Sequence, residues 1–327
     1  MKTLVLGGGS IGKRHVSNIL REFPNSKVQL ITKFSDKNHQ LFKDKRITLK
    51  SSLNKEEFFD LVYIATPASK HISDLNSLNR KCKKILIEKP LFNGFEKNNI
   101  PITNIYYERL LIGYILRFDP IIYKSREIIN SGKLGDLLYG RVWAGQYLPD
   151  WRPEIDYRKS VSAQKKLGGG PLHELSHEID YVTYLLNEKP NAVLCSLKNL
   201  SSLDIDTEDY CSLQLEFGKK IINFDLDFIA QPAKLGFCLY FELGIIEADF
   251  VNRELKVSFN KKVQNYNVAV SSFNSLYVDQ LHYLNNSLAK SKMKSISPAN
   301  LEDAILTMKI IQSSLKSNRI SSWVEIK

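Results

Sequence analysis

The sequence predicts an α/β domain with a doubly wound parallel sheet over residues 1–118, followed by an α+β domain with an open, mostly antiparallel sheet over residues 119–327. In the first part, short apolar runs alternate with helical patterns, as in parallel sheets whose strands are joined by helices. In the second part, strand-like runs follow one another with turn residues between them, as in antiparallel sheets. The chain length of 327 residues allows two hydrophobic cores.

Local patterns define the individual elements. In the first domain, strands are expected at 3–9, 27–32, 60–67, 83–90 and 109–118, and helices at 10–23 and 69–82. In the second domain, a helix at 119–135 precedes strands at 136–147, 191–200, 209–217, 220–230, 235–244, 245–250 and 254–259. A hairpin is expected around Gly218, and helices at 275–290 and 300–317 and a strand at 322–326 end the chain.

The composition is that of an ordinary globular protein, with 43% hydrophobic and 25% charged residues. No apolar run reaches the roughly 18 residues of a membrane helix, and glycines interrupt the short apolar N-terminus, so we expect no secretory signal. The four cysteines form no C-x-x-C pair and are expected as buried free thiols. We therefore expect a cytoplasmic protein with no membrane partner.

The net charge of +11 comes from 46 basic and 35 acidic residues and raises the question of a nucleic-acid partner. The lysines are scattered among acids, however, and no RNA-binding aromatic motif or DNA-reading helix pair stands out. We expect a solvated basic surface that attracts anionic small molecules such as nucleotides, and no nucleic-acid partner.

A glycine motif indicates where such a nucleotide would bind. Gly7, Gly9 and Gly12 have G-x-G-x-x-G spacing, follow a strand and open a helix. In that context the first glycine permits the tight turn, the second admits a pyrophosphate and the third allows helix and strand to pack closely. The first domain is therefore predicted to be a Rossmann dinucleotide-binding domain, with Ser10 and Ile11 also at the cofactor.

The end of the second strand bears on the choice of cofactor. An acid there would bind the adenosine ribose hydroxyls, but the sequence "LITKFS" supplies Thr32, Lys33 and Ser35 instead. A hydroxyl and a cation suit a 2′-phosphate better than a diol. The sequence therefore favours NADP over NAD, with a solvent-facing Lys33 as the alternative.

With these residues in place, the chain resembles the glucose-fructose oxidoreductase / inositol dehydrogenase / rhizopine catabolism (Gfo/Idh/MocA) family over nearly its whole length. The resemblance rests on spaced motifs in the same order: "GGGSIGKRH", "DLVYIATPASKH", "ILIEKPL", "GYILRFDP", "SGKLG", "GGGPLHELSHEIDYVTYLL" and "EDAILTMKIIQSS". It implies hydride transfer between a nicotinamide and a hydroxyl or keto carbon of a sugar or nucleotide sugar. Similar sequences containing "YLPDWRP" and "LSHEID" are associated with bacterial surface-polysaccharide and nonulosonate sugar pathways.

The resemblance also implies roles for individual residues. Lys89 of "EKP" lies beside the nicotinamide and bonds the reacting hydroxyl, and His177 is the catalytic histidine. Glu174 replaces the usual aspartate and either orients His177 or binds a second hydroxyl. Implied at the cofactor are Thr66, Pro67, His71, Glu88, Lys89, Trp151 and Arg152. Apart from the resemblance, Arg117 either contacts the cofactor or fixes the domain hinge, and Tyr157 and Arg158 either hold a sugar or its acidic substituent or are structural.

The segment 173–177 reads "HELSH", which also matches the H-E-x-x-H pattern of zinc metalloproteases. His173 and His177 would then bind zinc from one face of a helix. No downstream motif supplies a recognisable third ligand, although Asp204, Asp206 and Glu208 are loose candidates. We therefore expect no metal, and we expect Glu174 and His177 to share a helical face at i and i+3.

Two other functions remain open. The chain could be a cofactor-binding sensor without turnover, although a pure sensor does not require Lys89 and His177. It could also reduce an imine or enone, or use a retained cofactor as a transient oxidant. The open sheet of the second domain further predicts a homodimer or homotetramer, because its own helices need not cover both faces.

Overall fold

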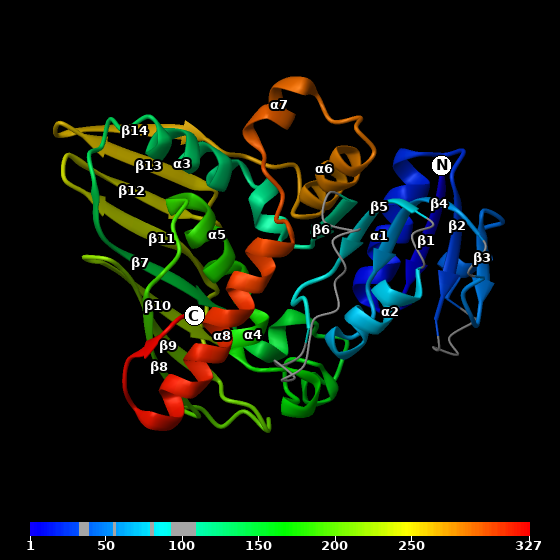
Figure 1. The fold of residues 1–327 in the computed structure, drawn as a ribbon, viewed down its shortest axis with the longest axis horizontal. Helices are drawn as coiled ribbons and strands as arrows, with labels where there is room; N and C mark the ends of the chain where they lie inside the picture. Colours follow the sequence, from blue (N-terminus) through cyan, green and yellow to red (C-terminus); the bar gives the residue numbers. More distant parts are fainter. Residues whose placement is uncertain (33–38, 55–56, 79–81, 93–108) are drawn as a thin grey trace. The chain divides into compact units, whose positions relative to one another are not determined.

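The computed structural model describes residues 1–32, 39–54, 57–78, 82–92 and 109–327. The chain forms two compact units (Figure 1): unit 1 comprises Met1–Phe118 and Ser271–Ala304, and unit 2 comprises Asp119–Val270 and Ile305–Lys327. Residues 271–304 were expected in the second domain. This segment belongs to unit 1 because Leu281 and Leu284 are buried in the hydrophobic core of that unit.

Unit 1 contains a parallel sheet with the strand order β3-β2-β1-β4-β5-β6, as expected for a Rossmann fold. The strands are β1 (Lys2–Leu6), β2 (Lys27–Ile31), β3 (Ile47–Lys50), β4 (Phe59–Ile64), β5 (Cys82–Ile87) and β6 (Leu110–Ile112). In the register of the sheet, Val5 of β1 pairs with Leu30 of β2 and Tyr63 of β4. The strand order reverses at β1 and β4, where ligands bind in this class of fold.

The helices of unit 1 are α1 (Ser10–Glu22), α2 (His71–Ser77), α6 (Asn274–Leu284) and α7 (Lys290–Ser295), with 3-10 turns η1 (Gln40–Lys43), η2 (Ala68–Lys70) and η4 (Ile115–Phe118). Helix α1 buries Val16, Ile19 and Leu20, the residues whose spacing predicted it. Its neighbour is α6: the side-chain amides of Asn18 and Asn274 bond each other at 2.9 and 3.2 Å.

Unit 2 contains a nine-stranded sheet with the order β14-β13-β12-β11-β7-β10-β9-β8-β15. Its strands are β7 (Leu137–Gly145), β8 (Ala192–Lys198), β9 (Tyr210–Phe217), β10 (Lys220–Asp227), β11 (Lys234–Phe241), β12 (Gly244–Asp249), β13 (Glu254–Phe259), β14 (Lys262–Asn267) and β15 (Val324–Glu325). Strands β7 and β10 pair in parallel, and the other neighbours pair antiparallel. The predicted hairpin joins β9 to β10 through Gly218, whose φ is +62°.

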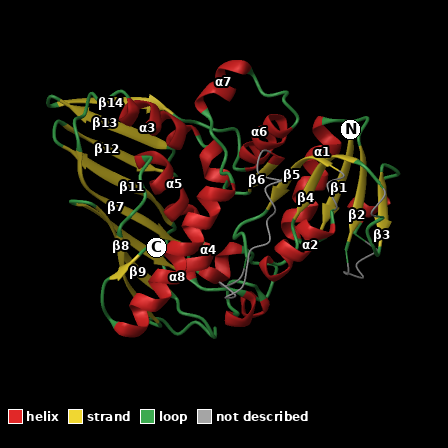
Figure 2. Ribbon diagram, in the orientation of Figure 1, coloured by secondary structure: helices red, strands yellow, loops and turns green. Residues whose placement is uncertain are grey.

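The helices of unit 2 are α3 (Pro120–Asn130), α4 (Pro171–Glu174), α5 (Ser176–Leu186) and most of α8 (Leu301–Ile320), with turns η5 (Leu148–Trp151), η6 (Tyr157–Lys159) and η7 (Lys165–Leu167). Helices α3, α5 and α8 lie against one face of the sheet (Figure 2). The Ser317 hydroxyl accepts a bond from the Cys195 amide at 2.9 Å and fixes α8 to β8. None of the helices in the described parts of the chain is long and apolar enough to span a lipid bilayer.

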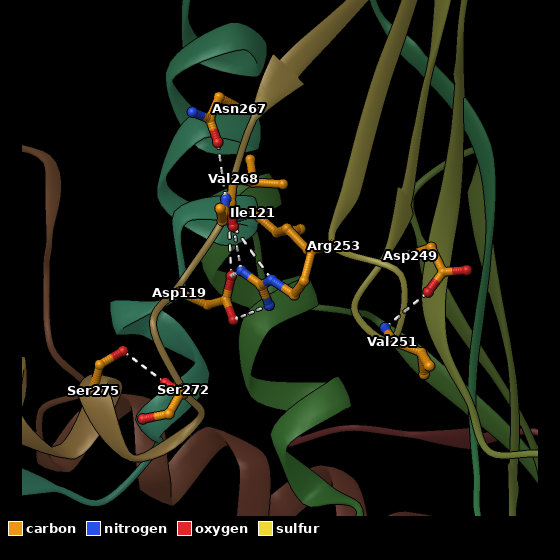
Figure 3. A network of polar contacts seen from close by, with 10 residues as sticks. Asp119, Ile121, Asp249, Val251, Arg253, Asn267, Val268, Ser272 and Ser275 are labelled. Carbon is orange, nitrogen blue, oxygen red and sulfur yellow. Dashed lines mark hydrogen bonds and ion pairs between the residues drawn. The ribbon is translucent and has the colours of Figure 1, made fainter.

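The start of unit 2 is fixed by a buried ion pair (Figure 3). Asp119 is 1% exposed, and Arg253 donates to its two carboxylate oxygens at 2.8 Å each. Arg253 also donates to the Val268 carbonyl at 2.6 Å. The Asp119 carboxylate in addition accepts from the Ile121 amide at 2.9 Å and so caps α3. The network joins the first residue of unit 2 to the segment just before the chain returns to unit 1.

Candidate active site

The glycine turn of unit 1 is shaped for a close ligand. Gly7 has φ +105°, and a Cβ there would collide with the backbone of Ala65. A Cβ on Gly12 would collide with the Gly7 carbonyl, so helix and strand pack as closely as the motif requires. At Gly9, by contrast, no other heavy atom of the described residues outside its chain neighbours lies within 4 Å of the Cβ position.

The space beside Gly9 fits a pyrophosphate. Gly9 is the N-cap residue of α1, and the first turn of this helix contains no acidic residue. The amides at a helix N-terminus and the helix dipole both favour an anion. The residues present therefore suit a dinucleotide cofactor, whose phosphates this turn would hold.

The residues expected at the adenosine end are only partly described. Thr32 follows β2, and its hydroxyl oxygen lies 2.6 Å from the position of a Cβ on Gly8, so it covers the glycine turn. Lys33 and Ser35 lie outside the described residues. The predicted preference for NADP therefore still depends on the sequence.

Backbone hydrogen bonds bring three loops to the same sheet edge. The Gly7 amide bonds the Ile31 carbonyl at 2.9 Å, and the Ala65 amide bonds the Leu6 carbonyl at 2.7 Å. The Glu88 amide likewise bonds the Ile64 carbonyl at 2.9 Å. The glycine turn, Thr66 and Pro67 after β4, and Lys89 after β5 thus follow the carboxyl ends of adjacent strands, where ligands bind in doubly wound sheets.

The loop after β4 is fixed by its own side chains. The Thr66 hydroxyl donates to the Asp74 carboxylate at 2.6 Å. His71 is 1% exposed, and its ring nitrogens lie 2.8 Å from the Thr66 carbonyl and 3.0 Å from the Pro90 carbonyl. Burial lowers the pKa of His71. The ring of His71, which was predicted to line the cofactor, joins two loops.

Glu88 is likewise directed into unit 1. Its carboxylate lies 2.7 Å from Nε2 of His15, which is 2% exposed. The His15 ring packs on Tyr63 with ring centroids 4.4 Å apart, and edge-on to Tyr277 at 5.7 Å. Burial, together with the nearby Glu88 charge, raises the pKa of Tyr277 to about 12. The next residue, Lys89, is half-buried.

Sequence reasoning did not single out His15, Asp74 or Tyr277. His15 stands inside the quoted motif "GGGSIGKRH", so the motif itself contained the signal. No motif marks Asp74, whose partner Thr66 lies eight residues earlier, or Tyr277, whose partner His15 is distant in the chain. Arg117 is 1% exposed and forms an ion pair with Asp303 at 3.0 Å, near the start of α8.

In unit 2, the segment "HELSH" was expected to lie on one continuous helix, but it is divided between two helices. Helix α4 ends at Glu174 and α5 begins at Ser176, because Leu175 has φ −96° and ψ 28° and interrupts the helical hydrogen-bond ladder. The expected i, i+3 arrangement of Glu174 and His177 on a continuous helical face was therefore wrong. The Glu174 carboxylate accepts from the Ser162 hydroxyl at 3.2 Å, and His177 is half-buried.

The glycine run before α4 is tightly packed. Gly168 and Gly170 have φ +84° and +95°, which favours glycine. The Glu208 carboxylate occupies the space beside Gly170, 2.6 Å from the position of its Cβ, and burial raises the pKa of Glu208. Within the described ranges, no three His, Cys, Asp or Glu side chains form a group that could hold a metal ion.

The remaining predicted site residues of unit 2 have partners within the unit. The Trp151 indole donates to the Gln146 carbonyl at 3.0 Å, and the Tyr157 hydroxyl accepts from the Asp204 amide at 3.3 Å. Arg158 donates to both oxygens of Asp156, at 2.8 and 3.0 Å. Arg152 is exposed. Unit 2 thus holds Glu174, His177 and this loop, and unit 1 holds the glycine turn and Lys89.

Comparison with known proteins identifies the family. A model of the "Oxidoreductase family, NAD-binding Rossmann fold" matches residues 1–99, and a model of the "GFO/IDH/MocA C-terminal domain" matches residues 122–247. The chain belongs to the Gfo/Idh/MocA family. This agrees with the resemblance that the spaced sequence motifs indicated.

Individual relatives of this Gfo/Idh/MocA chain are distant. The uncharacterized oxidoreductase YrbE of Bacillus subtilis is 24% identical over 226 residues, which are 66% of this chain and 63% of YrbE. Inositol 2-dehydrogenase of Rhizobium meliloti is 28% identical over 171 residues, 50% of this chain and 49% of the relative. The matches span 44–63% of the length of the most similar curated relatives. A levoglucosan dehydrogenase solved with NADH and levoglucosan has the same fold, with a TM-score of 0.80, 18% identity and 100% and 99% of the two chains covered.

Proposed function

We propose that the chain is an NAD(P)-dependent oxidoreductase that moves a hydride between the nicotinamide and a hydroxyl-bearing carbon of a sugar or nucleotide sugar. The main support is the edge of the parallel sheet, where Lys89 follows β5 beside the loop after β4 and near the glycine turn. Family membership and the open space at Gly9 support a dinucleotide cofactor.

In this proposal, side chains of the protein accept the proton of the substrate hydroxyl and stabilise the negative charge on its oxygen. Bound NAD(P) supplies the hydride acceptor. The substrate hydroxyl must lose its proton as the hydride leaves, and His177 is the proposed base because imidazole titrates near neutral pH. The Lys89 ammonium would stabilise negative charge that develops on the substrate oxygen. Glu174, already bonded to Ser162, would orient His177 or bind a second hydroxyl.

A substrate panel tests this function. We propose nucleotide sugars of surface-polysaccharide or nonulosonate pathways as the first candidates, supported by the resemblance and by the net charge of +11, which attracts phosphates. Purified protein would be incubated with NADP or NAD and with nucleotide sugars, free sugars or inositols, while reduced nicotinamide is followed by absorbance. Cofactor binding without turnover on any of them would instead support the sensor function.

We also propose that NADP binds more tightly than NAD. Thr32 covers the glycine turn, and the sequence after it contains Lys33 and no acid before Asp36. Fluorescence titration of the two reduced cofactors would measure the affinities. Tighter binding of NADH than of NADPH would refute the preference and leave the oxidoreductase function standing.

A further inference from the structure

The turn that contains Lys89 is anchored on both sides by buried histidines of unit 1. Before Lys89, the Glu88 carboxylate lies 2.7 Å from Nε2 of His15 on α1. After it, the Pro90 carbonyl lies 3.0 Å from Nδ1 of His71. The exposed fractions of the two histidines are 2% and 1%, so neither ring is at the surface.

The His71 ring bridges two loops that follow neighbouring strands. Its Nε2 lies 2.8 Å from the Thr66 carbonyl after β4, while Nδ1 contacts Pro90 after β5. Both partners are acceptors, so a neutral ring donates to one of them at a time and an imidazolium donates to both. In either state both ring nitrogens face backbone carbonyls, so a ligand could bind to a ring nitrogen only by displacing one of them.

His15 has the corresponding position on the other side. It lies on α1, the helix that begins at the glycine turn, and its ring is enclosed by Tyr63 and Tyr277. The Glu88 carboxylate also packs on Gly113, where a Cβ would lie 2.7 Å from Oε2. A short hydrogen bond in such a buried place restricts the backbone that carries it.

We infer that His15 and His71 are positioning residues for Lys89, one holding Glu88 and the other holding Pro90. The inference rests on the proposed function, in which Lys89 acts on the reacting oxygen. Misplacement of a reacting group by about 1 Å can cost roughly 10²-fold in rate. Loss of either anchor should therefore lower kcat far more than it weakens cofactor binding.

Amide substitutions separate the contacts of each ring. The amide nitrogen of asparagine takes the place of Nδ1, and that of glutamine takes the place of Nε2. His71→Asn therefore keeps the Pro90 bond and loses the Thr66 bond, and His71→Gln does the reverse. We expect kcat to fall at least about tenfold further in His71→Gln than in His71→Asn, with the Kd for the cofactor similar in both.

The His15 pair should show the opposite order. Its contact with Glu88 uses Nε2, so His15→Gln keeps the anchor and His15→Asn loses it. If a His71 variant does not fold, the two His15 variants still test whether the anchor of Glu88 positions Lys89. Equal kcat values within both pairs, whether or not the proteins are destabilised, would show that the histidines are only structural.

A readout without turnover separates this inference from the proposed function. Competitive acetylation, followed by peptide mass spectrometry, would compare the reactivity of Lys89 with that of the exposed Lys133. We expect the ratio of Lys89 to Lys133 acetylation to change at least about twofold in His71→Gln and less in His71→Asn, relative to the wild type. If the wild type transfers no hydride but the ratio still separates the variants, the proposed function fails and the positioning stands. Unchanged ratios in both variants would overturn the positioning.

Discussion

At the residue scale, we expect substitutions of Gly9 and Gly12 to have different effects, although both glycines belong to one motif. A Cβ at Gly12 would strike the Gly7 carbonyl, whereas the Cβ position at Gly9 is open. We expect Gly9→Ala to unfold at the wild-type temperature but to bind the cofactor at least tenfold more weakly, about 1.4 kcal/mol. Gly12→Ala should lower the unfolding temperature itself.

Thermal unfolding and fluorescence titration of the two variants would measure these effects. If Gly9→Ala bound both cofactors with wild-type affinity, the open space would not be the pyrophosphate site. Gly132→Ala is a suitable control, because Gly132 also has open space but follows α3 in unit 2. Its φ of +68° makes some loss of stability expected, with no change in cofactor affinity.

The residues proposed for catalysis give a second test. Lys89→Ala and His177→Ala should each lower kcat by roughly 10²–10⁴-fold, the usual worth of general acid–base groups, while cofactor affinity stays nearly constant. His173→Ala is the matched control, since the mechanism does not use it. Steady-state kinetics would decide. Equal losses in His173→Ala and His177→Ala, with Lys89→Ala fully active, would contradict the mechanism and favour the metalloprotease pattern.

The sequence predicted these residues through motifs, but it could not predict their contacts. "EKP" pointed to Lys89, yet the anchors on either side come from His15 and His71, which are distant in the chain. Trp151 was placed at the cofactor from the resemblance, and Arg158 was expected either to bind the sugar or to be structural. In the structure Trp151 donates to the Gln146 carbonyl and Arg158 donates to Asp156. Such contacts depend on tertiary packing, which local patterns do not record.

At the element scale, the ion pair between Arg253 and Asp119 should matter to unit 2. Arg253→Met would leave a carboxylate that is 1% exposed without its cation and should cost about 3 kcal/mol of unfolding free energy. Arg158→Met is the control, because the side chain of Arg158 is 55% exposed and exposed pairs contribute little.

Urea denaturation followed by tryptophan fluorescence would measure this effect. All three tryptophans, Trp143, Trp151 and Trp323, belong to unit 2, so the signal reports that unit. A lower midpoint with unchanged slope is expected for Arg253→Met. Equal midpoints for the two variants would show that the network in Figure 3 does not stabilise the unit.

Elements that the sequence missed are short or polar. Strand β3 has four residues, two of them exposed, and strand β14 reads "KVQNYN" with five exposed residues of six. Strand β3 alternates apolar and polar residues over only four positions, and β14 shows no such alternation. Strand β14 instead pairs with β13 through a turn at Asn260 and Lys261, both with positive φ. The break between helices α4 and α5 at Leu175 was also not predicted, because no Gly or Pro stands there in the sequence.

At the scale of the whole molecule, we expect a homodimer or homotetramer. Helices lie against one face of the nine-stranded sheet (Figure 2). On β9, the residues that alternate with the buried ones are partly exposed, and on β7 and β11 Tyr139 and Tyr240 stack with ring centroids 4.3 Å apart. Aromatic residues are enriched in protein interfaces.

Light scattering coupled to size exclusion would give the mass in solution. Tyr139→Asp together with Tyr240→Asp should shift the population toward monomer, because charge is costly in a buried interface. A wild-type protein that is monomeric at micromolar concentration would refute the expected oligomer. A stable oligomer that the double variant does not disturb would place the interface elsewhere.

The central claim is that a hydride leaves a hydroxyl-bearing carbon of the substrate for the nicotinamide. The most direct measurement uses the best substrate of the panel with deuterium on the reacting carbon and analyses the reduced cofactor by mass spectrometry. We expect one deuterium atom in each reduced nicotinamide, in proportion to the oxidised product, and a large loss of this signal in Lys89→Ala and His177→Ala. Product formed without net cofactor reduction, or reduced cofactor that lacks deuterium, would contradict the account.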